Sequence, residues 1–222
     1  MRVFLCKIKG LIVLLYRTSR SVLGSTSSQL GLHLMVNKDD NGKNKRTAII
    51  GGTFNALHQG HKYYIKLAFD FADEVFILLT SDEYARICKS YKVNPYNDRA
   101  NSLKAYIHQI ADGKLFHIIK MESDAFLINF CTANDITMAV IIPEYYSLFQ
   151  RINNIREDEH KHPLLLLVTQ RIKTSEGFNI SSTLLHNLRQ HHELNPKQYS
   201  AEVAAYFDEP KPLTDITNIM PS

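Results

Sequence analysis

Short apolar runs recur along the chain from about residue 46 onwards, and each run is continuous rather than alternating with polar residues. Continuous runs of this length are typical of strands that are buried on both faces of a parallel sheet. The pattern therefore predicts strands at Ala48–Ile50, Val75–Leu79, Phe116–Ile119, Met138–Ile142 and Leu164–Val168.

Helical patterns lie between these runs. In "GHKYYIKLAFDFADE", which begins at Gly60, one helical face carries the apolar residues Tyr64, Ile65, Ala68, Phe69 and Ala72. The segments Asp98–Ala111 and Glu144–Glu157 are further predicted helices. Alternation of strand and helix predicts an α/β fold with a doubly wound parallel sheet. Ligands of such sheets bind beyond the carboxyl ends of the strands, next to the N-termini of helices.

The first 45 residues have a different composition. They contain no acidic residue before Asp39 and are rich in Ser, Arg and Lys. Their apolar residues recur at helical spacing, which predicts a basic amphipathic helix, and they are Phe4, Ile8, Leu11, Ile12 and Leu15. This composition is typical of an organelle transit peptide, and a disordered extension without an address is the equal alternative. We therefore expect a cytoplasmic protein or, through residues 1–45, a mitochondrial or other organellar one.

The remaining boundaries follow from polar and proline-containing segments. Residues 37–46, "NKDDNGKNKR", are predicted to be a polar linker, so the domain itself is placed at residues 46–195. Residues 196–222 form a tail with one predicted short helix, Ser200–Phe207, and a loose end.

Composition removes several classes of function. The chain has 26 Lys+Arg and 22 Asp+Glu residues, a net charge of +4, which does not favour a nucleic-acid partner. No apolar run approaches the roughly 20 residues that span a bilayer, so no membrane span is expected. The cysteines Cys6, Cys88 and Cys131 form no CxxC pair, and they are interpreted as ordinary thiols rather than a zinc site or a disulfide framework.

The candidate chemistry begins at the end of the first apolar run, in "IIGGTFNALHQGH" (Ile49–His61). Gly51 and Gly52 are expected to let the backbone turn tightly and approach a ligand. Thr53, His58 and His61 then converge with the N–H groups of a helix that begins near Gly60, which together suit a phosphate. No nucleophile with a base and an orienting group is present, so hydrolase chemistry is not indicated. No further ligand stands at useful spacing for a metal site.

A second anion-binding corner is predicted in "FNISSTLLHNL" (Phe178–Leu188). Ser181, Ser182 and Thr183 stand directly before a helical pattern, and Ser181 or Ser182 is a natural N-cap. Hydroxyl groups and unpaired N–H groups at a helix start attract anions. Two such corners on one sheet suggest a polyphosphate held between them.

These residues resemble a known superfamily. "GGTFNALHQGH" is similar to the GGTFDxxHxGH signature of the HxGH nucleotidyltransferases, and "ISST" is similar to their ISSTxxR motif. The segments Leu79–Ile107 and Arg151–Val168 resemble the archaeal and eukaryotic type of phosphopantetheine adenylyltransferase. The resemblance covers roughly Thr47 to Leu188 and implies a Rossmann-like nucleotidylyltransferase fold.

The resemblance also implies a reaction and roles for residues. The family makes dephospho-coenzyme A and pyrophosphate from ATP and 4'-phosphopantetheine, with Mg²⁺, by in-line displacement at the α-phosphate. His58, His61 and Thr53 match the residues at the reacting phosphates, and Gly51 and Gly52 match the close-approach turn. The other matches are a phosphate-binding lysine, either Lys89 or Lys92, the β- and γ-phosphate motif Ser181, Ser182 and Thr183, and the pair Asn153 and Arg156 beside the nucleotide or pantetheine.

The chain departs from the family pattern at several positions. Asn55 replaces an Asp in the expected substrate site, and Leu184 and His186 stand where arginines follow ISST, with Arg189 one turn further on. A lost arginine removes a bidentate phosphate contact. The alternatives are therefore another HxGH nucleotidyltransferase, such as one that acts on nicotinamide mononucleotide, or a catalytically impaired nucleotide-binding protein. No G-x-x-x-x-G-K-[ST] segment occurs, so a single reaction is expected, and the sequence indicates no oligomeric state.

Overall fold

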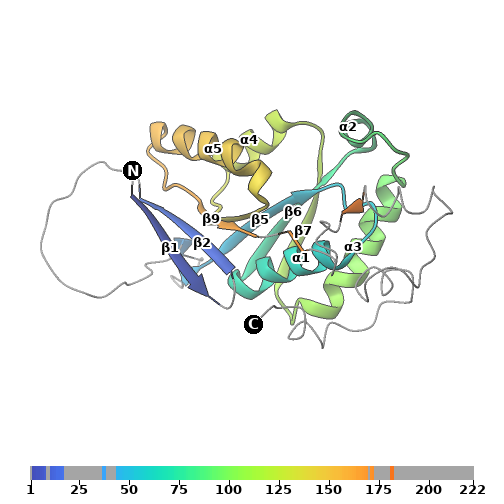
Figure 1. Cartoon of the computed structure of the whole chain (residues 1–222), viewed down its shortest axis with the longest axis horizontal. Coiled ribbons are helices and arrows are strands. Elements are labelled where there is room, and N and C mark those ends of the chain that lie inside the picture. The colour runs from blue at the N-terminus through green and yellow to red at the C-terminus, as the bar shows by residue number, and fades with distance from the viewer. Residues whose placement is uncertain are drawn as a thin grey trace, which may run out of the picture.

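The computed structural model describes residues 2–8, 11–17, 37–38, 44–169, 171–172 and 181–182, with side chains from residue 45 onwards (Figure 1). The predicted helix Ser200–Phe207 lies outside these residues, and so do Thr183, Leu184, His186 and Arg189.

Parallel strands form the centre of the fold. They are β5 (Thr47–Gly52), β6 (Glu74–Thr80), β7 (Leu115–Met121), β8 (Met138–Ile141) and β9 (Leu165–Val168). All five predicted strands are thereby confirmed. Their spatial order is β9-β8-β5-β6-β7, so the chain winds from β5 first to one side and then to the other. The order reverses between β5 and β8, which is the topological switch point where ligands of doubly wound sheets bind.

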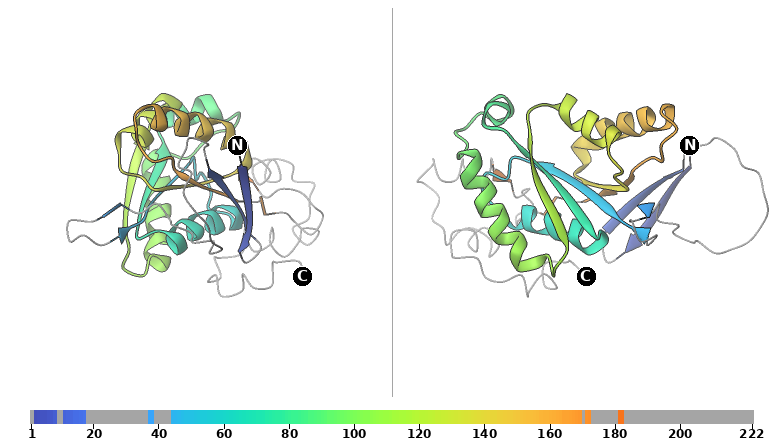
Figure 2. Two further views of the ribbon diagram at one scale, coloured as in Figure 1. Left: turned by 90° about the vertical axis from the view of Figure 1, so that its left-hand side faces the viewer. Right: turned by 180° about the vertical axis from the view of Figure 1, so that it is seen from behind.

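Helices cover both faces of this sheet (Figures 1 and 2). One face packs against α1 (Gln59–Phe71) and α3 (Tyr96–Ile110), and the other against α4 (Asp124–Ala133) and α5 (Tyr146–Asp158). Alternate residues of β5 point to opposite faces of the sheet. Ile50 packs in the core beside α1 and α3, and Ile49 packs in the core beside α4 and α5. The structure confirms the Rossmann-like α/β class and the three predicted helices.

Short elements at the strand ends were not predicted individually. They are α2 (Asp82–Cys88), the 3₁₀ turn η1 (Pro143–Tyr145) and α4. The hydroxyl groups of Ser81 and Ser123 cap α2 and α4 by accepting from the backbone N–H groups of Tyr84 and Phe126. A serine followed by an acidic residue after an apolar run is the sequence signal that would have found both helices.

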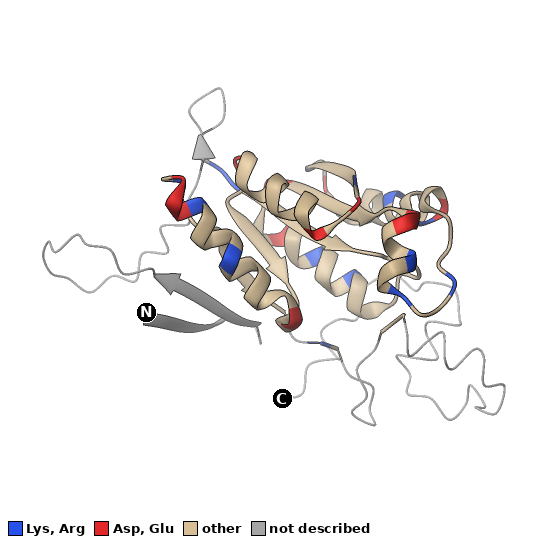
Figure 3. Cartoon of the chain, turned by 90° about the horizontal axis from the view of Figure 1, so that it is seen from above, with Lys and Arg blue, Asp and Glu red and all other residues tan. Residues whose placement is uncertain are grey.

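Charge is mixed over the described elements. Figure 3 shows Lys and Arg residues interspersed with Asp and Glu residues along the helices, which agrees with the near balance of the two signs in the sequence. Among the described residues, no helix is long and apolar enough to cross a membrane.

The N-terminal helix prediction is wrong. Residues Arg2–Ile8 (β1) and Leu11–Arg17 (β2) are antiparallel strands in the register Ile8↔Leu11, and β2 pairs with β9 at Val13↔Leu167. The runs "RVFLCKI" and "LIVLLYR" are rich in aliphatic residues and are separated only by Lys9 and Gly10, which is the sequence pattern of a hairpin. Helical spacing does not distinguish helix from strand here, because in so apolar a segment every third or fourth position is apolar in either case.

The predicted linker is also partly structured. Asn37–Lys38 (β3) and Asn44–Lys45 (β4) pair as a short antiparallel ribbon in the register Lys38↔Asn44. Whether residues 1–45 carry an address to an organelle stays a prediction, because the pairing of β1 and β2 does not bear on it.

We expect a chain that lacks residues 1–36 to fold. From residue 45 onwards, where side chains are described, the buried hydrophobic cores extend from Ala48 to Val168, and β2 joins β9 at the register pair Val13↔Leu167. Urea unfolding of the truncated and full chains should differ by no more than about 2 kcal/mol, the scale of a few partly exposed hydrogen bonds. A truncated chain without a cooperative transition would show that the hairpin is an integral part of the core.

Candidate active site

A cavity of about 490 Å³ opens at the carboxyl ends of the parallel strands, at the switch point between β5 and β8. Its size is that of a small-molecule site. One group of lining residues is polar or basic, and another is apolar or aromatic. The first includes Thr53, His58, His61, Lys89, Arg171, Ser181 and Ser182, and the second includes Tyr84, Met121, Leu127, Ile142, Tyr145 and Phe149.

The turn after β5 brings the motif residues into this cavity. Its left-handed residue is Phe54, with φ 45°. At Gly52 a Cβ atom would lie 3.1 Å from the ring of the buried Phe54, a tight contact that favours glycine. Gly51 has more room, with its nearest neighbour at 3.7 Å. Both glycines still line the cavity, so backbone approach to a ligand is possible at this edge.

A tyrosine holds the switch point together. The Tyr64 hydroxyl, on α1, donates to the carbonyl oxygen of Val140 at 2.8 Å and accepts from the N–H group of Gly51 at 3.3 Å. These contacts join the ends of β8 and β5 beside the cavity. The aromatic position was predicted only as part of the apolar face of α1, because its hydroxyl partners are distant in sequence.

The two motif histidines form a stacked pair at the start of α1. His58 is the N-cap, and its Nδ1 accepts from the backbone N–H group of His61 at 3.3 Å. The imidazole rings are 3.8 Å apart between centroids. The Nδ1 of His61 lies 2.8 Å from the Ala56 carbonyl oxygen, and because a carbonyl only accepts, this nitrogen carries the proton. The convergence predicted for Thr53, His58 and His61 is therefore present, since all three line one cavity.

Both imidazoles are neutral at physiological pH. Burial, together with the neighbouring His61 and Arg171, lowers the pKa of His58 to about 2. Burial also lowers the pKa of His61 to about 4, against the opposing effect of the Ala56 carbonyl and with the help of Lys89. In the neutral pair the Nε2 of His58 carries a hydrogen and can donate, whereas the Nε2 of His61 can only accept.

Acid should destabilise the protein through His58. Its pKa is lower in the folded state than in the unfolded chain, so the unfolded state binds the proton first and stability falls as pH decreases below about 6.5. Between pH 7 and pH 5 the wild type should lose about 2 kcal/mol more unfolding free energy than His58→Asn, since Asn keeps the N-cap but does not titrate. Urea titrations at both pH values measure this difference.

The matched control is His108→Asn, because His108 is exposed on α3. Its loss of stability over the same pH interval should equal that of the wild type. An equal loss in wild type and His58→Asn would mean that His58 is already protonated in the folded protein at pH 5.

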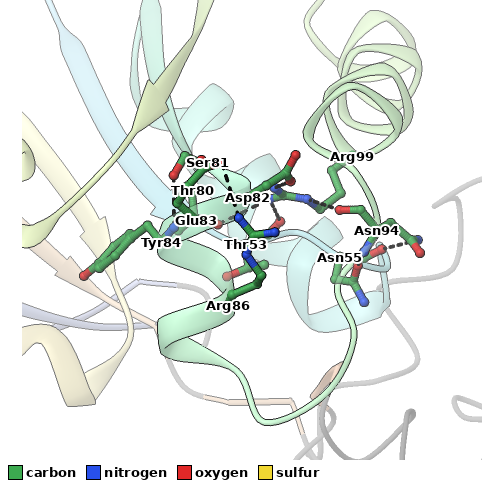
Figure 4. A network of polar contacts seen from close by, with 10 residues as sticks. All are labelled: Thr53, Asn55, Thr80, Ser81, Asp82, Glu83, Tyr84, Arg86, Asn94 and Arg99. Atoms are coloured by element: carbon green, nitrogen blue, oxygen red, sulfur yellow. Dashed lines mark hydrogen bonds and ion pairs between the residues drawn. The ribbon is translucent and has the colours of Figure 1, made fainter.

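A buried guanidinium ties the loops of the site together (Figure 4). Arg99, on α3, has a fully buried side chain and forms a 2.8 Å ion pair with Asp82. It donates to the carbonyl oxygen of Thr53 at 2.9 Å, to that of Asn94 at 2.8 Å, and to the hydroxyl of Thr80 at 3.3 Å. The turn after β5, the end of β6 and the loop before α3 are thus joined at one side chain.

Asn55 belongs to the same set of loop contacts. Its Oδ1 accepts from the backbone N–H group of Asn94 at 2.6 Å, as Figure 4 shows. An amide oxygen can accept this bond as a carboxylate would, so the contact does not require the charge of an Asp. Asn55 does not line the cavity, and its expected contact with substrate is therefore not supported by this geometry.

Removing the Arg99 guanidinium should destabilise the fold strongly. Arg99→Ala leaves two carbonyl groups and a buried hydroxyl without their donor, and the expected cost is about 3 kcal/mol. Arg86→Ala, on α2, is the control, because its pair with Glu83 is 3.4 Å long and its side chain is 71% exposed. That variant should change the unfolding free energy by less than about 0.5 kcal/mol. Similar unfolding midpoints for the two variants would contradict the role of Arg99.

The structure distinguishes the two candidate lysines. Lys89 is the C-cap of α2 and lines the cavity, where its charge contributes to the lowered pKa of His61. Lys92 is exposed and does not line the cavity, so the geometry favours Lys89 alone. Ser181 and Ser182 line the cavity as the resemblance implies, and Thr183 lies outside the described residues.

The geometry does not support the expected ligand contacts of Asn153 and Arg156. Both residues are buried on α5 and neither lines the cavity. Arg156 donates to the carbonyl oxygens of four residues, His162, Cys131, Asn134 and Ile136. Asn153 exchanges two hydrogen bonds with the backbone of Leu164, at 3.0 and 2.7 Å. These hydrogen bonds fix the backbone segments that lead into β8 and β9. Spacing in the sequence cannot distinguish this structural role from ligand binding.

Sequence reasoning missed one basic residue of the cavity. Arg171 follows β9 and lines the cavity together with the motif residues. It belongs to no motif, and only the position just beyond the carboxyl end of a predicted strand could have drawn attention to it.

Comparisons with known proteins agree with this geometry. The cytidylyltransferase-like family matches residues 49–187, which include nearly the whole cavity wall. The phosphopantetheine adenylyltransferase of Methanosarcina acetivorans is 34% identical over 136 residues, which cover 60% of this chain and 85% of that protein. The protein of the same name from Pyrococcus horikoshii is 34% identical over 146 residues, which cover 64% of this chain and 89% of that protein.

A longer relative shares only part of its length. The bifunctional phosphopantetheine adenylyltransferase/NTP phosphatase of Thermoplasma acidophilum is 34% identical over 139 residues, which cover 63% of this chain. The chain spans only 41% of the length of that relative. A Rossmann-like sheet with paired histidines and a helix N-terminus at its switch point is the architecture of a nucleotidyltransferase. The chain belongs to the cytidylyltransferase-like family and, within it, to the phosphopantetheine adenylyltransferases.

Proposed function

We propose that the chain transfers the adenylyl group of ATP to 4'-phosphopantetheine and releases pyrophosphate and dephospho-coenzyme A. The observation that carries this proposal is a cavity at the switch point in which groups suited to phosphate meet an apolar wall. The chain that forms this cavity belongs to the cytidylyltransferase-like family. Relatives that carry the name phosphopantetheine adenylyltransferase support the choice of acceptor. The apolar and aromatic lining from Met121, Leu127 and Phe149 suits the pantetheine arm or the adenine ring.

The reaction is an in-line displacement. An oxygen of the 4'-phosphate attacks the α-phosphorus of ATP, the bond from that phosphorus to the bridging oxygen breaks, and pyrophosphate leaves with the bonding electrons. The described cavity offers cations and donors rather than an activated nucleophile, so positioning and electrostatic stabilisation carry the rate. In this proposal His58 donates its Nε2 hydrogen to the α-phosphate, and Lys89 neutralises charge on the phosphates.

His61 acts differently from His58, because its neutral ring has no hydrogen on Nε2. A bound polyanion favours the charged imidazolium and raises the pKa of His61 from about 4. In this proposal nucleotide binding therefore takes up a proton, and the resulting imidazolium donates to the reacting phosphate. Burial keeps the His61 ring neutral in the free enzyme. The negative charge of the bound nucleotide then favours the protonated ring, which can donate from Nε2.

Magnesium enters as part of the substrate. No group of three or more His, Cys, Asp or Glu side chains in the described ranges is arranged to hold a metal ion. We propose that Mg²⁺ arrives bound to the phosphate oxygens of ATP, where it lowers their net charge, and that the chain contacts the phosphates themselves.

Purified full-length chain with ATP, Mg²⁺ and 4'-phosphopantetheine should release pyrophosphate. His61→Ala should lower turnover by roughly two to three orders of magnitude, the scale for losing one donor to the transition state. His108→Ala, at an exposed histidine of α3, should retain wild-type turnover. A coupled pyrophosphate assay measures all three proteins.

Release with nicotinamide mononucleotide but not with 4'-phosphopantetheine would replace the proposed acceptor. Binding of ATP without release on either acceptor would identify a catalytically impaired nucleotide-binding protein. Wild-type turnover by His61→Ala would mean that this histidine serves only the start of α1.

A further inference from the structure

The cavity contains a guanidinium that the family motifs do not account for. The resemblance expects arginines after ISST, but the chain has Leu184 and His186 at those positions. Arg171 instead reaches the cavity from the end of β9, ten residues before Ser181 in the sequence. Among the described residues that line the cavity, Arg171 and Lys89 are the cationic side chains.

A carboxylate holds this guanidinium in one orientation. The Nε and Nη2 atoms of Arg171 lie 2.8 and 2.7 Å from Oε1 of Glu144, which belongs to η1. Both contacts use one edge of the planar group. Within the described part of the chain, the Nη1 atom has no partner, so its two hydrogens are available to a ligand.

The position of Arg171 is that of a phosphate contact. It lines the same cavity as His58, Ser181 and Ser182, and its charge acts on His58 strongly enough to contribute to the lowered pKa of that ring. Ser181 and Ser182 match the motif that holds the β- and γ-phosphates. A guanidinium that shares the cavity with these serines and acts on His58 is therefore a candidate contact on the leaving-group side of the nucleotide.

We propose that Arg171, oriented by Glu144, binds the β- and γ-phosphates of ATP in place of the arginine that is missing after Thr183. The inference rests on the proposed function for its ligand. Arg171 supplies the planar donor group that makes two hydrogen bonds to phosphate oxygens, which the His186 ring cannot supply. In this proposal, the cation that the family pattern has after ISST is supplied instead by Arg171, from the end of β9.

A purely structural role leads to a different expectation. The side chains of Arg171 and Glu144 are 32% and 53% exposed, and an ion pair with such exposure adds little to stability. If the pair served only the fold, removing either partner would have the same small effect on every ligand. A phosphate contact instead predicts a loss that depends on the number of phosphates in the nucleotide.

The experiment compares ATP and AMP binding to full-length protein by calorimetry in the presence of Mg²⁺. Arg171→Ala should weaken ATP binding roughly 10- to 100-fold, the range for a charged hydrogen bond, and should change AMP binding less than about threefold. Arg171→Lys should recover part of the ATP affinity, because it restores the charge without the planar fork. Glu144→Gln should weaken ATP binding less than Arg171→Ala, since the guanidinium remains. In turnover assays the KM for ATP should rise in Arg171→Ala, while the KM for 4'-phosphopantetheine stays unchanged.

Arg151→Ala is the matched control, because Arg151 is an exposed arginine of α5. It should leave both nucleotide affinities unchanged. ATP affinity within threefold of wild type in Arg171→Ala would overturn the inference, and so would an equal loss for ATP and AMP in a variant that keeps the wild-type unfolding midpoint. Because binding needs no turnover, an inactive wild type would contradict the proposed function and still allow the ATP–AMP comparison to test Arg171.

Discussion

The geometry of the cavity depends on the buried guanidinium of Arg99. It joins the turn that carries Thr53 to the end of β6 and to the loop before α3 through one side chain. A planar group with five donors can satisfy several carbonyl groups in a space too small for water, which no other side chain does as well. The turn after β5 is thereby hydrogen-bonded to α3 as well as connected to the sheet.

Burial determines the chemistry of the histidine pair. The rings stack at the N-terminus of α1, where desolvation lowers the pKa of both, with Arg171 adding to the effect on His58 and Lys89 to the effect on His61. In the free protein the pair therefore presents one donor and one acceptor rather than two positive charges. Among the described lining residues, the permanent cations are Lys89 and Arg171, on the connections after the carboxyl ends of β6 and β9. The permanent charges and the titratable imidazoles thus come from different strand ends around one cavity.

The departures from the family pattern acquire separate explanations. Asn55 provides the oxygen that accepts from Asn94, a task for which the charge of an Asp is not needed. The absence of an arginine after ISST is accompanied by an arginine elsewhere in the cavity wall. The INxxR residues Asn153 and Arg156, by contrast, hydrogen-bond the backbone that leads into β9 and β8. A motif match therefore identifies a position, and the surrounding contacts decide whether that position serves the ligand or the fold.

The sequence by itself determined the five parallel strands, three of the helices between them, and the turn and helix start at Gly51–His61, because continuous apolar runs and short motifs are local signals. Only the tertiary structure decided which side chains share the cavity. Arg171 joins it and Lys92, Asn153 and Arg156 do not, although all four are polar residues near predicted element ends. Helical spacing also failed at residues 2–17, where pairing with β9 outweighs local periodicity. The physical reason is the same in each case, since a side chain's partners come from segments distant in the chain.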